Sequence, residues 1–338
     1  MQTARCGSPL SRTRARHSSM SRARVLVTGA GGFIGSHLVS SLKREGHAVR
    51  GADLKYPEFS PTSADEYIIC DLREVREATP AFRDVDYVCA LAADIGGMGH
   101  ISKNEADILT NNTLISINSL RLATRYRVER FLFASSACVY PMTLQTAPES
   151  PALQEDAVLP ADPQGAYGWE KLFSEQACRY YSEQHRLDVR VARLHNIYGP
   201  EGTYQGGREK APAAICRKVA AAQPCDAIEI WGDGGQTRSF CYISDCVDAL
   251  SRLLASNITQ PVNIGSEEAI SIESLARKII SVSGKKLDLR FTDGPEGVRG
   301  RTSDSTRAHR LLDWRPTTPL DAGLARTYEW IAAQLQRA

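Results

Sequence analysis

The sequence predicts an α/β protein with a doubly wound parallel sheet and a smaller, discontinuous α/β domain. Two observations predict the sheet. Short buried runs such as "VLV" at residues 25–27 alternate with helical stripes such as that of Leu38 and Leu42, which is typical of parallel strands covered by helices. The glycine-rich turn "GAGGFIG" joins the first strand to the first helix, as the phosphate-binding turn of such sheets does.

Further runs extend the predicted sheet. "YIICDLRE" and "VDYVCALAAD" indicate the next two strands, with Asp71 and the Ala92-Ala93 turn at their carboxyl ends. In doubly wound sheets of the Rossmann type, ligands bind at that edge. "VRVARLHNIYGP" and "VNIGS" predict later strands, and "FCYISDCVDALSRLLA" predicts a strand or loop followed by a returning helix.

Length and composition narrow the class of protein. The 338 residues are 42% hydrophobic, which suffices for one large domain or two. The chain has no run of about 18 apolar residues, so we predict no membrane span. The nine cysteines are scattered and lack CxxC pairs or histidine partners at zinc spacing. This pattern indicates free thiols in a reducing compartment and no metal site.

Charge is distributed unevenly along the chain. The formal net charge is +2, but residues 1–24 hold six arginines and no acidic residue, so the remainder carries −4. A body of that charge gives no reason to expect nucleic-acid binding. The leader is rich in Arg and Ser, as organellar transit peptides are. A disordered extension ahead of a second start at Met20 explains the same composition.

The glycine turn indicates a dinucleotide site. Gly29, Gly32 and Gly35 are spaced so that the backbone can turn tightly and approach a pyrophosphate at a helix N-terminus. A glycine cluster alone also fits an ordinary turn. Here it follows a strand, opens a helix and precedes Asp53 at the end of the next strand, and this context makes the motif specific.

Asp53 also indicates which cofactor binds. A carboxylate at this place accepts hydrogen bonds from ribose hydroxyls and repels a 2′-phosphate, so we predict NAD rather than NADP. Two nearby cations, Arg50 and Lys55, weaken that inference slightly.

A tyrosine and a lysine four residues apart are the candidate reacting groups. In "DPQGAYGWEKLFSEQACRYY", Tyr167 and Lys171 fall on one face of a predicted helix. An ordinary solvated helix also presents such pairs. In this context an ammonium beside the phenol is expected to lower the tyrosine pKa from about 10, so that tyrosinate takes a proton from a sugar hydroxyl. Ser136, which ends the strand "RFLFASS", is expected to hydrogen-bond that hydroxyl.

Together these motifs resemble the extended short-chain dehydrogenase/reductase family. The resemblance rests on "GAGGFIG", Asp53, "SSACVY" and "YGWEK", and it runs from about Arg24 to the end of the chain. Six segments, "AADIGGMGHI", "SSACVYP", "HNIYGP", "GGREKAPAA", "WGDGGQTRSF" and "GPEGVRGR", are similar to members that epimerise GDP-mannose at C3 and C5. The resemblance therefore implies production of GDP-L-galactose, with GDP-L-gulose as a second product, in L-ascorbate biosynthesis.

The resemblance also implies a route. Tyr167 removes the proton of the C4 hydroxyl while hydride passes to NAD, and the 4-ketone acidifies the C–H bonds at C3 and C5. The hydride returns after proton exchange, so no net oxidation occurs. Cys138 and Lys210 are the candidate acid/base pair. The residues alone leave open that Cys138 is a small core residue and that Lys210 only holds phosphate.

The implied binding residues form two sets. The cofactor set consists of Gly29, Gly32, Phe33, Ile34, Gly35, Asp53, Asp71, Ala92, Tyr167 and Lys171. The substrate set consists of Gly96, Ser136, Ala137, Cys138, Asn196, Glu209, Lys210, Ala211, Lys218, Gln236, Thr237, Arg238, Arg299 and Arg301. Whether Arg299 or Arg301 holds the diphosphate stays open.

Three further features concern the substrate. The loop "IGGMGH" lies over the sugar in the resemblance, whereas by itself it fits a plain turn. His100 stands where the resemblance implies an aromatic residue. Trp231 and Trp314 are expected to be buried core residues rather than groups that stack on a base.

The resemblance implies how the chain is organised. We expect a disordered leader over 1–22, an NAD-binding domain over 23–200 and 236–265, and a nucleotide-sugar domain over 201–235 and 266–338. The site would lie in the cleft between the two domains. The protein is expected to be a cytoplasmic homodimer whose partner is a GDP-sugar, with no nucleic-acid or membrane partner.

Two alternatives stay open. One is another NAD-dependent nucleotide-sugar epimerase or a 4,6-dehydratase, and Cys138 in place of an acidic residue argues against dehydration. The other is a non-catalytic NAD-sensing protein on the same scaffold, since a fold alone does not prove activity. The intact Tyr167 and Lys171, with Ser136, argue against a sensor.

Overall fold

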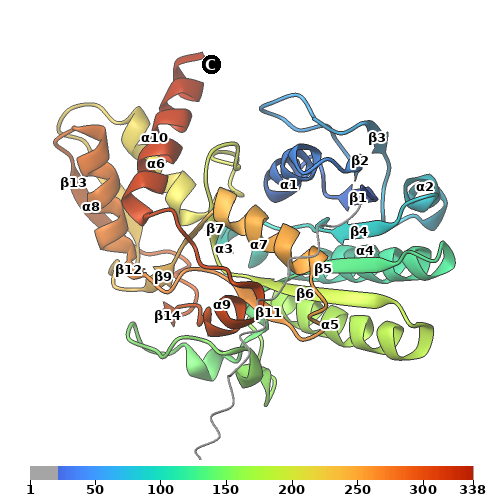
Figure 1. The fold of residues 1–338 in the computed structure, drawn as a ribbon. Coiled ribbons are helices and arrows are strands. Elements are labelled where there is room, and N and C mark those ends of the chain that lie inside the picture. The colour runs from blue at the N-terminus through green and yellow to red at the C-terminus, as the bar shows by residue number, and fades with distance from the viewer. Residues whose placement is uncertain (1–21, 338) are drawn as a thin grey trace, which may run out of the picture.

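The computed structural model describes residues 22–337. The predicted leader over 1–22 therefore lies outside the described residues, apart from Arg22. The described chain forms one large sheet covered by helices, with a group of smaller sheets and helices beside it (Figure 1).

The large sheet has seven parallel strands in the order β11-β6-β5-β4-β1-β2-β3. The strand order reverses between β1 and β4, so the sheet is doubly wound and the predicted fold class is confirmed. The strands are β1 (Arg24–Thr28), β2 (Ala48–Asp53), β3 (Glu66–Ile69), β4 (Tyr87–Ala90), β5 (Arg130–Ser136), β6 (Asp188–Leu194) and β11 (Val262–Ile264).

Helices cover both faces of this sheet. The pair α1 and α7 packs on one face, and the pair α4 and α5 packs on the other (Figure 1). Because α5 contacts both its neighbour α4 and strands β5 and β6, two of its faces are buried. The elements are α1 (Phe33–Arg44), α2 (Val75–Ala78), η1 (Thr79–Phe82), α3 (Met98–Ile101), α4 (Glu105–Arg125), α5 (Gly165–His185) and α7 (Ile243–Ala255).

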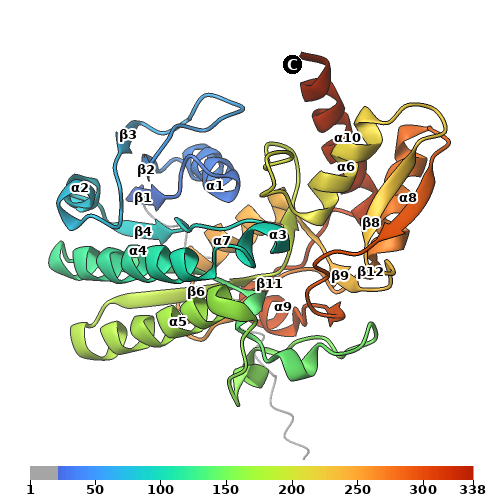
Figure 2. The ribbon, with the colours of Figure 1, turned by 180° about the vertical axis from the view of Figure 1, so that it is seen from behind.

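The smaller group is assembled from the later part of the chain. Strands β8 and β13 form a parallel pair, β9 lies between β12 and β14, and β7 pairs with β10. Figure 2 shows α6, α8 and α10 packed together beside these strands. The strands are β7 (Ile197–Tyr198), β8 (Ala227–Trp231), β9 (Thr237–Ser239), β10 (Cys241–Tyr242), β12 (Ala269–Ser271), β13 (Asp288–Thr292) and β14 (Gly300–Arg301). The remaining helices of the described chain are η2 (Ala137–Val139), η3 (Met142–Leu144), η4 (Glu155–Val158), α6 (Ala211–Ala221), α8 (Ile272–Ser283), α9 (Thr306–Leu312) and α10 (Leu320–Arg337).

The ends of the helices follow local chemistry. Ser271 caps α8 by accepting a hydrogen bond from the Ser274 backbone N–H at 3.1 Å. Gly284 ends α8 with a φ of 68° and Arg186 ends α5 with a φ of 57°, both left-handed. Helix α1 begins after Gly32 without any side-chain cap. Its first N–H groups are therefore free to meet an anion.

One apolar cluster joins the two parts of the molecule. It includes Val25 of β1 and Leu38 of α1 together with Ile215 of α6 and Ile331 of α10. The two parts therefore share buried surface. The domain boundaries expected from the sequence stay a prediction.

The two tryptophans of the later segments differ in burial. Trp314 is only 2% exposed and donates from Nε1 to the Asp245 carbonyl at 3.1 Å, as expected of a core residue. Trp231 is 45% exposed, so the core prediction was wrong for it. The reason is that β8 is an edge strand of a two-stranded sheet, which buries only alternate side chains.

The structure also bears on the cysteines and on the predicted absence of a membrane span. The eight cysteines within residues 22–337 are free thiols. Over the same residues, every helix is too short or too polar to cross a bilayer.

Candidate active site

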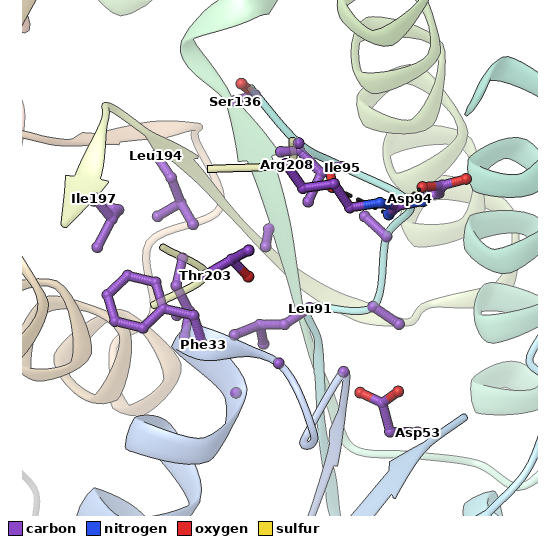
Figure 3. Close-up of a pocket in the computed structure, with 18 of the residues that line it drawn as sticks. Phe33, Asp53, Leu91, Asp94, Ile95, Ser136, Leu194, Ile197, Thr203 and Arg208 are labelled. Carbon is purple, nitrogen blue, oxygen red and sulfur yellow. Dashed lines mark hydrogen bonds and ion pairs between the residues drawn. The ribbon is translucent and has the colours of Figure 1, made fainter. Parts of the chain in front are cut away.

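A cavity of about 550 Å³ runs along the carboxyl ends of the sheet strands. Asp53 at the end of β2 and Ser136 at the end of β5 lie on opposite sides of it (Figure 3). All ten predicted cofactor residues line it, and four of the predicted substrate residues do so as well. Those four are Gly96, Ser136, Asn196 and Lys210.

The glycine turn forms the floor of the cavity at the Asp53 side. Gly29 has a φ of 73°, and a Cβ on it would lie 2.7 Å from the Ala92 nitrogen. A Cβ on Gly35 would lie 2.0 Å from the Gly29 carbonyl oxygen. Both positions therefore require glycine, Gly29 because the segment after β4 packs against it and Gly35 because α1 packs directly on the turn. The close packing leaves the N-terminus of α1 facing the cavity.

Asp53 is held by backbone N–H groups. Its carboxylate accepts from Gly31 at 2.9 Å and from Leu54 at 2.6 Å. Burial raises the pKa of Asp53, and these backbone hydrogen bonds oppose that rise. Of the two nearby cations, Arg50 is bound to Glu66 at 2.6 Å and Lys55 lies 3.4 Å from Glu58. Neither ion pair involves Asp53, so its carboxylate remains available to a ribose.

Tyr167 and Lys171 lie close together on α5, as the spacing predicted. The Lys171 Nζ is 5.6 Å from the Tyr167 ring centroid and 4.9 Å from that of Phe133 on β5. Both polar residues are almost fully buried. The cation therefore packs over the two ring faces rather than against the phenol oxygen.

The pKa of Tyr167 differs from the expectation. Burial raises it well above 10, the charges of Cys138 and Glu170 raise it further, and a hydrogen bond with Ser136 lowers it. We expected Lys171 to lower this pKa below 10, and that was wrong for the structure. The physical reason is that removing the phenolate from water outweighs one cation that does not touch its oxygen.

Cys138 contacts polar groups of three other residues. It belongs to η2, and its backbone N–H donates to the Ser136 hydroxyl at 3.2 Å. Its Sγ lies 3.4 Å from Nη1 of Arg301 and 3.8 Å from Oε1 of Gln164. The thiol is half-buried and faces a guanidinium. Cys138 also packs against the apolar cluster of Ile101, Ile108 and Tyr167, so it has both apolar and polar neighbours.

Lys210 immediately precedes α6, and its side chain opens into the cavity. Enclosure by protein lowers the pKa of Lys210, and the negative charges of the Cys138 and Cys246 thiolates would oppose that shift. A lowered pKa makes it easier for an amine to accept and return a proton. The charges of Lys210 and Cys138 would interact, so the two side chains lie in the same region of the molecule.

The two candidate arginines of the phosphate site have different surroundings. Arg299 pairs with Asp233 at 3.0 Å and with Glu296 at 2.9 Å, so its charge is already compensated. Arg301 is buried and donates only to neutral oxygens and sulfur, namely Gln145 at 2.5 Å, Gln164 at 2.7 Å and Cys138. The geometry therefore favours Arg301 as the guanidinium with charge to offer an anion.

Arg238 is a second guanidinium, half-buried, without a carboxylate partner among the described residues. It donates to the Thr237 and Glu296 carbonyls. Burial and the Arg301 charge lower its pKa to about 9. An anion placed between Arg238 and Arg301 would relieve their repulsion.

Several predicted substrate residues have other partners and lie outside the lining of the cavity. Lys218 donates to the Glu229 carbonyl at 2.7 Å, and Thr237 donates to the Pro148 carbonyl at 2.5 Å. Gln236 donates to the Trp231 carbonyl at 3.1 Å, but its buried Oε1 has no partner among the described residues. Outside the lining are Ala137, Cys138, Glu209, Ala211, Lys218, Gln236, Thr237, Arg238, Arg299 and Arg301.

Asn196 lines the cavity in a strained backbone conformation. Its φ is 44°, and its Nδ2 donates to the Ser239 carbonyl at 2.9 Å. One of its two amide protons is thus used within the protein, and we expected the amide to donate to the sugar diphosphate. Only the remaining polar atoms can meet a substrate.

Sequence reasoning missed an ion pair over the cavity. Arg208 binds Asp94 at 3.0 Å, on the same side as Ser136 (Figure 3). Gly97 N–H also donates to the Arg208 carbonyl at 3.0 Å, so the loop after β4 is joined to the segment before α6. His100 lies 3.6 Å from the same Asp94. Arg208 and Asp94 are 114 positions apart in the sequence, so no local pattern connects them.

Comparison with known proteins identifies the relatives of this chain. Residues 25–265 match the model of the NAD dependent epimerase/dehydratase family. The chain is 45% identical over 316 residues to GDP-mannose 3,5-epimerase of Arabidopsis thaliana, covering 93% of this chain and 83% of the relative. It is 46% identical over the same length to GDP-mannose 3,5-epimerase 1 of Oryza sativa subsp. indica, with the same coverage.

Solved structures agree with the fold. UDP-glucuronic acid 4-epimerase of Bacillus cereus, solved with UDP-glucuronic acid and NAD, is 28% identical with a TM-score of 0.79 and covers 92% of this chain and 99% of its own. UDP-glucose 4-epimerase of Thermotoga maritima, solved with UDP-glucose, has a TM-score of 0.84 at 24% identity, with the same coverage. The second likeness shows the fold alone.

Proposed function

The chain belongs to the NAD dependent epimerase/dehydratase family, and we propose that it is an enzyme that inverts C3 and C5 of GDP-mannose. The product is GDP-L-galactose, with GDP-L-gulose as a second product. The observation that carries this proposal is that Lys210 lines the same cavity as Tyr167 and Lys171, while Cys138, outside the lining, contacts Ser136 at its edge.

The residues present fit NAD. The free N-terminus of α1 and the glycine turn leave room for a pyrophosphate, and Asp53 accepts hydrogen bonds at the end of β2. The cavity extends from Asp53 to Tyr167. NAD, when bound, accepts a hydride from C4 and later returns it.

Tyr167, Ser136 and Lys171 act at C4. Tyr167 takes the proton of the C4 hydroxyl and later returns it, because it is the buried phenol nearest to Ser136 in the cavity. Ser136 orients that hydroxyl by a hydrogen bond. Lys171 opposes the effect of burial by placing a positive charge beside the phenol ring.

Cys138 and Lys210 act at C3 and C5. Once C4 is a ketone, the neighbouring C–H bonds are acidic because the carbanion is delocalised as an enolate. One of the two groups removes a proton and the other delivers one to the opposite face. Arg301 donates from Nη1 to Cys138 Sγ at 3.4 Å and so orients the thiol.

The same geometry argues against the alternatives. A 4,6-dehydratase requires a strong acid to expel water, and the group beside Tyr167 is a thiol facing a guanidinium. A sensor protein has no need for two proton-transfer groups on one cavity, the buried Tyr167 and the more exposed Lys210. The substrate diphosphate is expected to bind between Arg238 and Arg301, whose charges the described residues leave uncompensated.

A homodimer is part of the proposal. Large apolar side chains are exposed on the outer faces of α4 and α5, and a second copy of the same surface would bury them. They are Leu109, Leu114, Trp169, Phe173 and Tyr180. A cytoplasmic location and a role in L-ascorbate biosynthesis complete the proposal, supported by the free thiols and by the implied product.

Exchange of sugar protons with heavy water tests the proposal. The protein is incubated with GDP-mannose in heavy water, and the sugar is followed by proton NMR. Deuterium should enter C3 and C5 but not C4, because the C4 hydrogen leaves and returns as hydride. Deuterium at C5 alone would reduce the activity to 5-epimerisation. No deuterium with any GDP-hexose would overturn the proposal.

A further inference from the structure

Helix α5 carries a buried acid that the chemistry described above does not use. Glu170 directly precedes Lys171 in the segment "YGWEK". Its side chain is completely buried, and that of Lys171 is 3% exposed. A buried carboxylate is costly unless it is paired or hydrogen-bonded, so its presence beside Lys171 requires an explanation.

The two oxygens of Glu170 have different partners. Oε1 accepts hydrogen bonds from Ser174 at 2.9 Å and from Ser116 of α4 at 3.3 Å. Oε2 has no hydrogen-bond partner among the described residues and lies 3.8 Å from Lys171 Nζ. The serines thus fix one oxygen, and the other is directed at the ammonium.

The position of α5 explains how both residues are buried. Lys171 points to the sheet, where its Nζ lies over the Phe133 ring of β5. Glu170 points to α4, where it meets Ser116. The pair therefore bridges the two buried faces of one helix, and its charges interact in a setting of low dielectric constant.

We propose that Glu170 is a positioning residue for the C4 chemistry, the buried counter-ion that keeps Lys171 charged beside Tyr167. This inference rests on the proposed function for its role in catalysis, but the ion pair itself is a property of the fold. Removing one partner of a buried pair leaves the other charge uncompensated. Without Glu170, Lys171 would release its proton more readily.

The other charged groups near Tyr167 and Lys171 have partners of their own. Glu175, one turn further along α5, is paired with Arg193 of β6 at 2.7 Å. Cys138, the other group whose charge raises the pKa of Tyr167, faces Arg301, and Ser136 is neutral. Glu170 is the acid whose charge acts on Tyr167 from within α5 itself.

The pH profile of the first half-reaction tests the role. Holoenzyme is mixed rapidly with GDP-mannose, and the near-ultraviolet absorbance of NADH is followed over a range of pH for the wild type, Glu170→Gln and Glu170→Asp. Loss of a negative charge lowers the proton affinity of both Tyr167 and Lys171. In Glu170→Gln both limbs of the profile should therefore move to lower pH, by about one unit.

Controls separate this effect from a loss of packing. Glu170→Asp keeps the charge, so its profile should stay near that of the wild type even if the rate falls. Glu183→Gln removes an exposed charge of the same helix, paired with Arg179 at 3.9 Å, and should change nothing. A Glu170→Gln profile that loses height without moving would overturn the proposal.

A measurement without substrate keeps the inference independent of the proposed function. Lysine is isotopically labelled, the Lys171 signal is assigned with Lys171→Arg, and its titration is followed by NMR. Lys171 should lose its proton at lower pH in Glu170→Gln than in the wild type. Equal titration in both proteins would overturn the proposal, whereas a shifted titration in a protein that never reduces NAD would overturn only the epimerase function.

Discussion

The two ends of the cavity are built in different ways. At the nucleotide end, β1, the glycine turn, α1 and β2 come from one stretch, residues 24–53, and the contacts are made mainly by backbone N–H groups. At the end proposed to hold the sugar, the candidate groups come from five separate segments and would act through side chains. Tyr167 and Lys210 line the cavity there, and Cys138, Arg238 and Arg301 lie outside its lining. A backbone site tolerates few changes of shape, whereas a side-chain site can change its chemistry by single substitutions.

The largest loss of turnover should come from substitution of Tyr167, which lies where the two ends of the cavity meet. Tyr167→Phe removes the phenol oxygen and keeps the ring, which packs against Ile101 and Ile108. Turnover of GDP-mannose should fall about a thousandfold, as expected for loss of an acid/base group, while NAD binding is retained. Deuterium exchange and NAD titration measure the two quantities. Retention of substantial turnover would remove Tyr167 from the chemistry.

A substitution at the sugar end alone should separate exchange from oxidation. Cys138→Ala should lower deuterium exchange at C3 and C5 about a hundredfold and leave NAD affinity unchanged. Rapid-mixing absorbance should still show reduction of bound NAD, because Tyr167 and Lys171 are intact.

The exposed thiol Cys225 supplies the matched control. Cys225→Ser should behave as the wild type in both assays. Undiminished exchange in Cys138→Ala would return Cys138 to a structural role.

At the nucleotide end, adding a single methyl group to a glycine should be enough to weaken NAD binding. Gly35→Ala places a Cβ 2.0 Å from the Gly29 carbonyl oxygen, so α1 must shift. Overpacking of this kind costs about 1–3 kcal/mol, and NAD affinity should fall roughly ten- to hundredfold. In Gly32→Ala the nearest atom is 3.3 Å away, and the loss should be smaller. Equal affinities in the two variants would contradict the packing argument.

The smallest predicted effect is on the free energy of unfolding, through a buried histidine that belongs to neither end of the cavity. His195 follows β6 and is fully buried, and burial lowers its pKa from 6.5 to about 3. The unfolded chain thus binds the proton more tightly than the folded one, so stability is complete above pH 6.5 and decreases as pH falls toward 3. The loss should be on the order of 1–3 kcal/mol near pH 4.5.

Urea unfolding at several pH values measures this loss. His195→Gln should lack this part of the acid sensitivity, although its stability at neutral pH is lower. Identical pH dependence in the two proteins would show that His195 is not the group responsible.

Local patterns predicted much of the molecule because their physics is local. The turn after β1 needs glycine within a few residues, and Tyr167 and Lys171 meet because helical spacing brings them together. The cofactor residues accordingly all reached the cavity. Trp231 was placed wrongly because the burial of an edge strand depends on what packs against it, which β8 does not encode.

The pKa of Tyr167 shows the limit of reasoning from spacing. The pattern indicated a cation nearby, but not that the phenol is enclosed or that Glu170 adds a negative charge. Burial is set by α4 and by the segment around Cys138, which come from other parts of the chain. Desolvation then outweighs the effect of the cation.

By itself the sequence determined the doubly wound sheet, the glycine turn with Asp53, and the tyrosine-lysine pair, because periodicity and helical spacing act over a few residues. Tertiary structure alone decided that Arg299 is neutralised by acids whereas Arg301 reaches Cys138, 163 residues away. It also decided that Glu170 faces a buried ammonium rather than water. Charges act through space, and which charges meet is set by the fold.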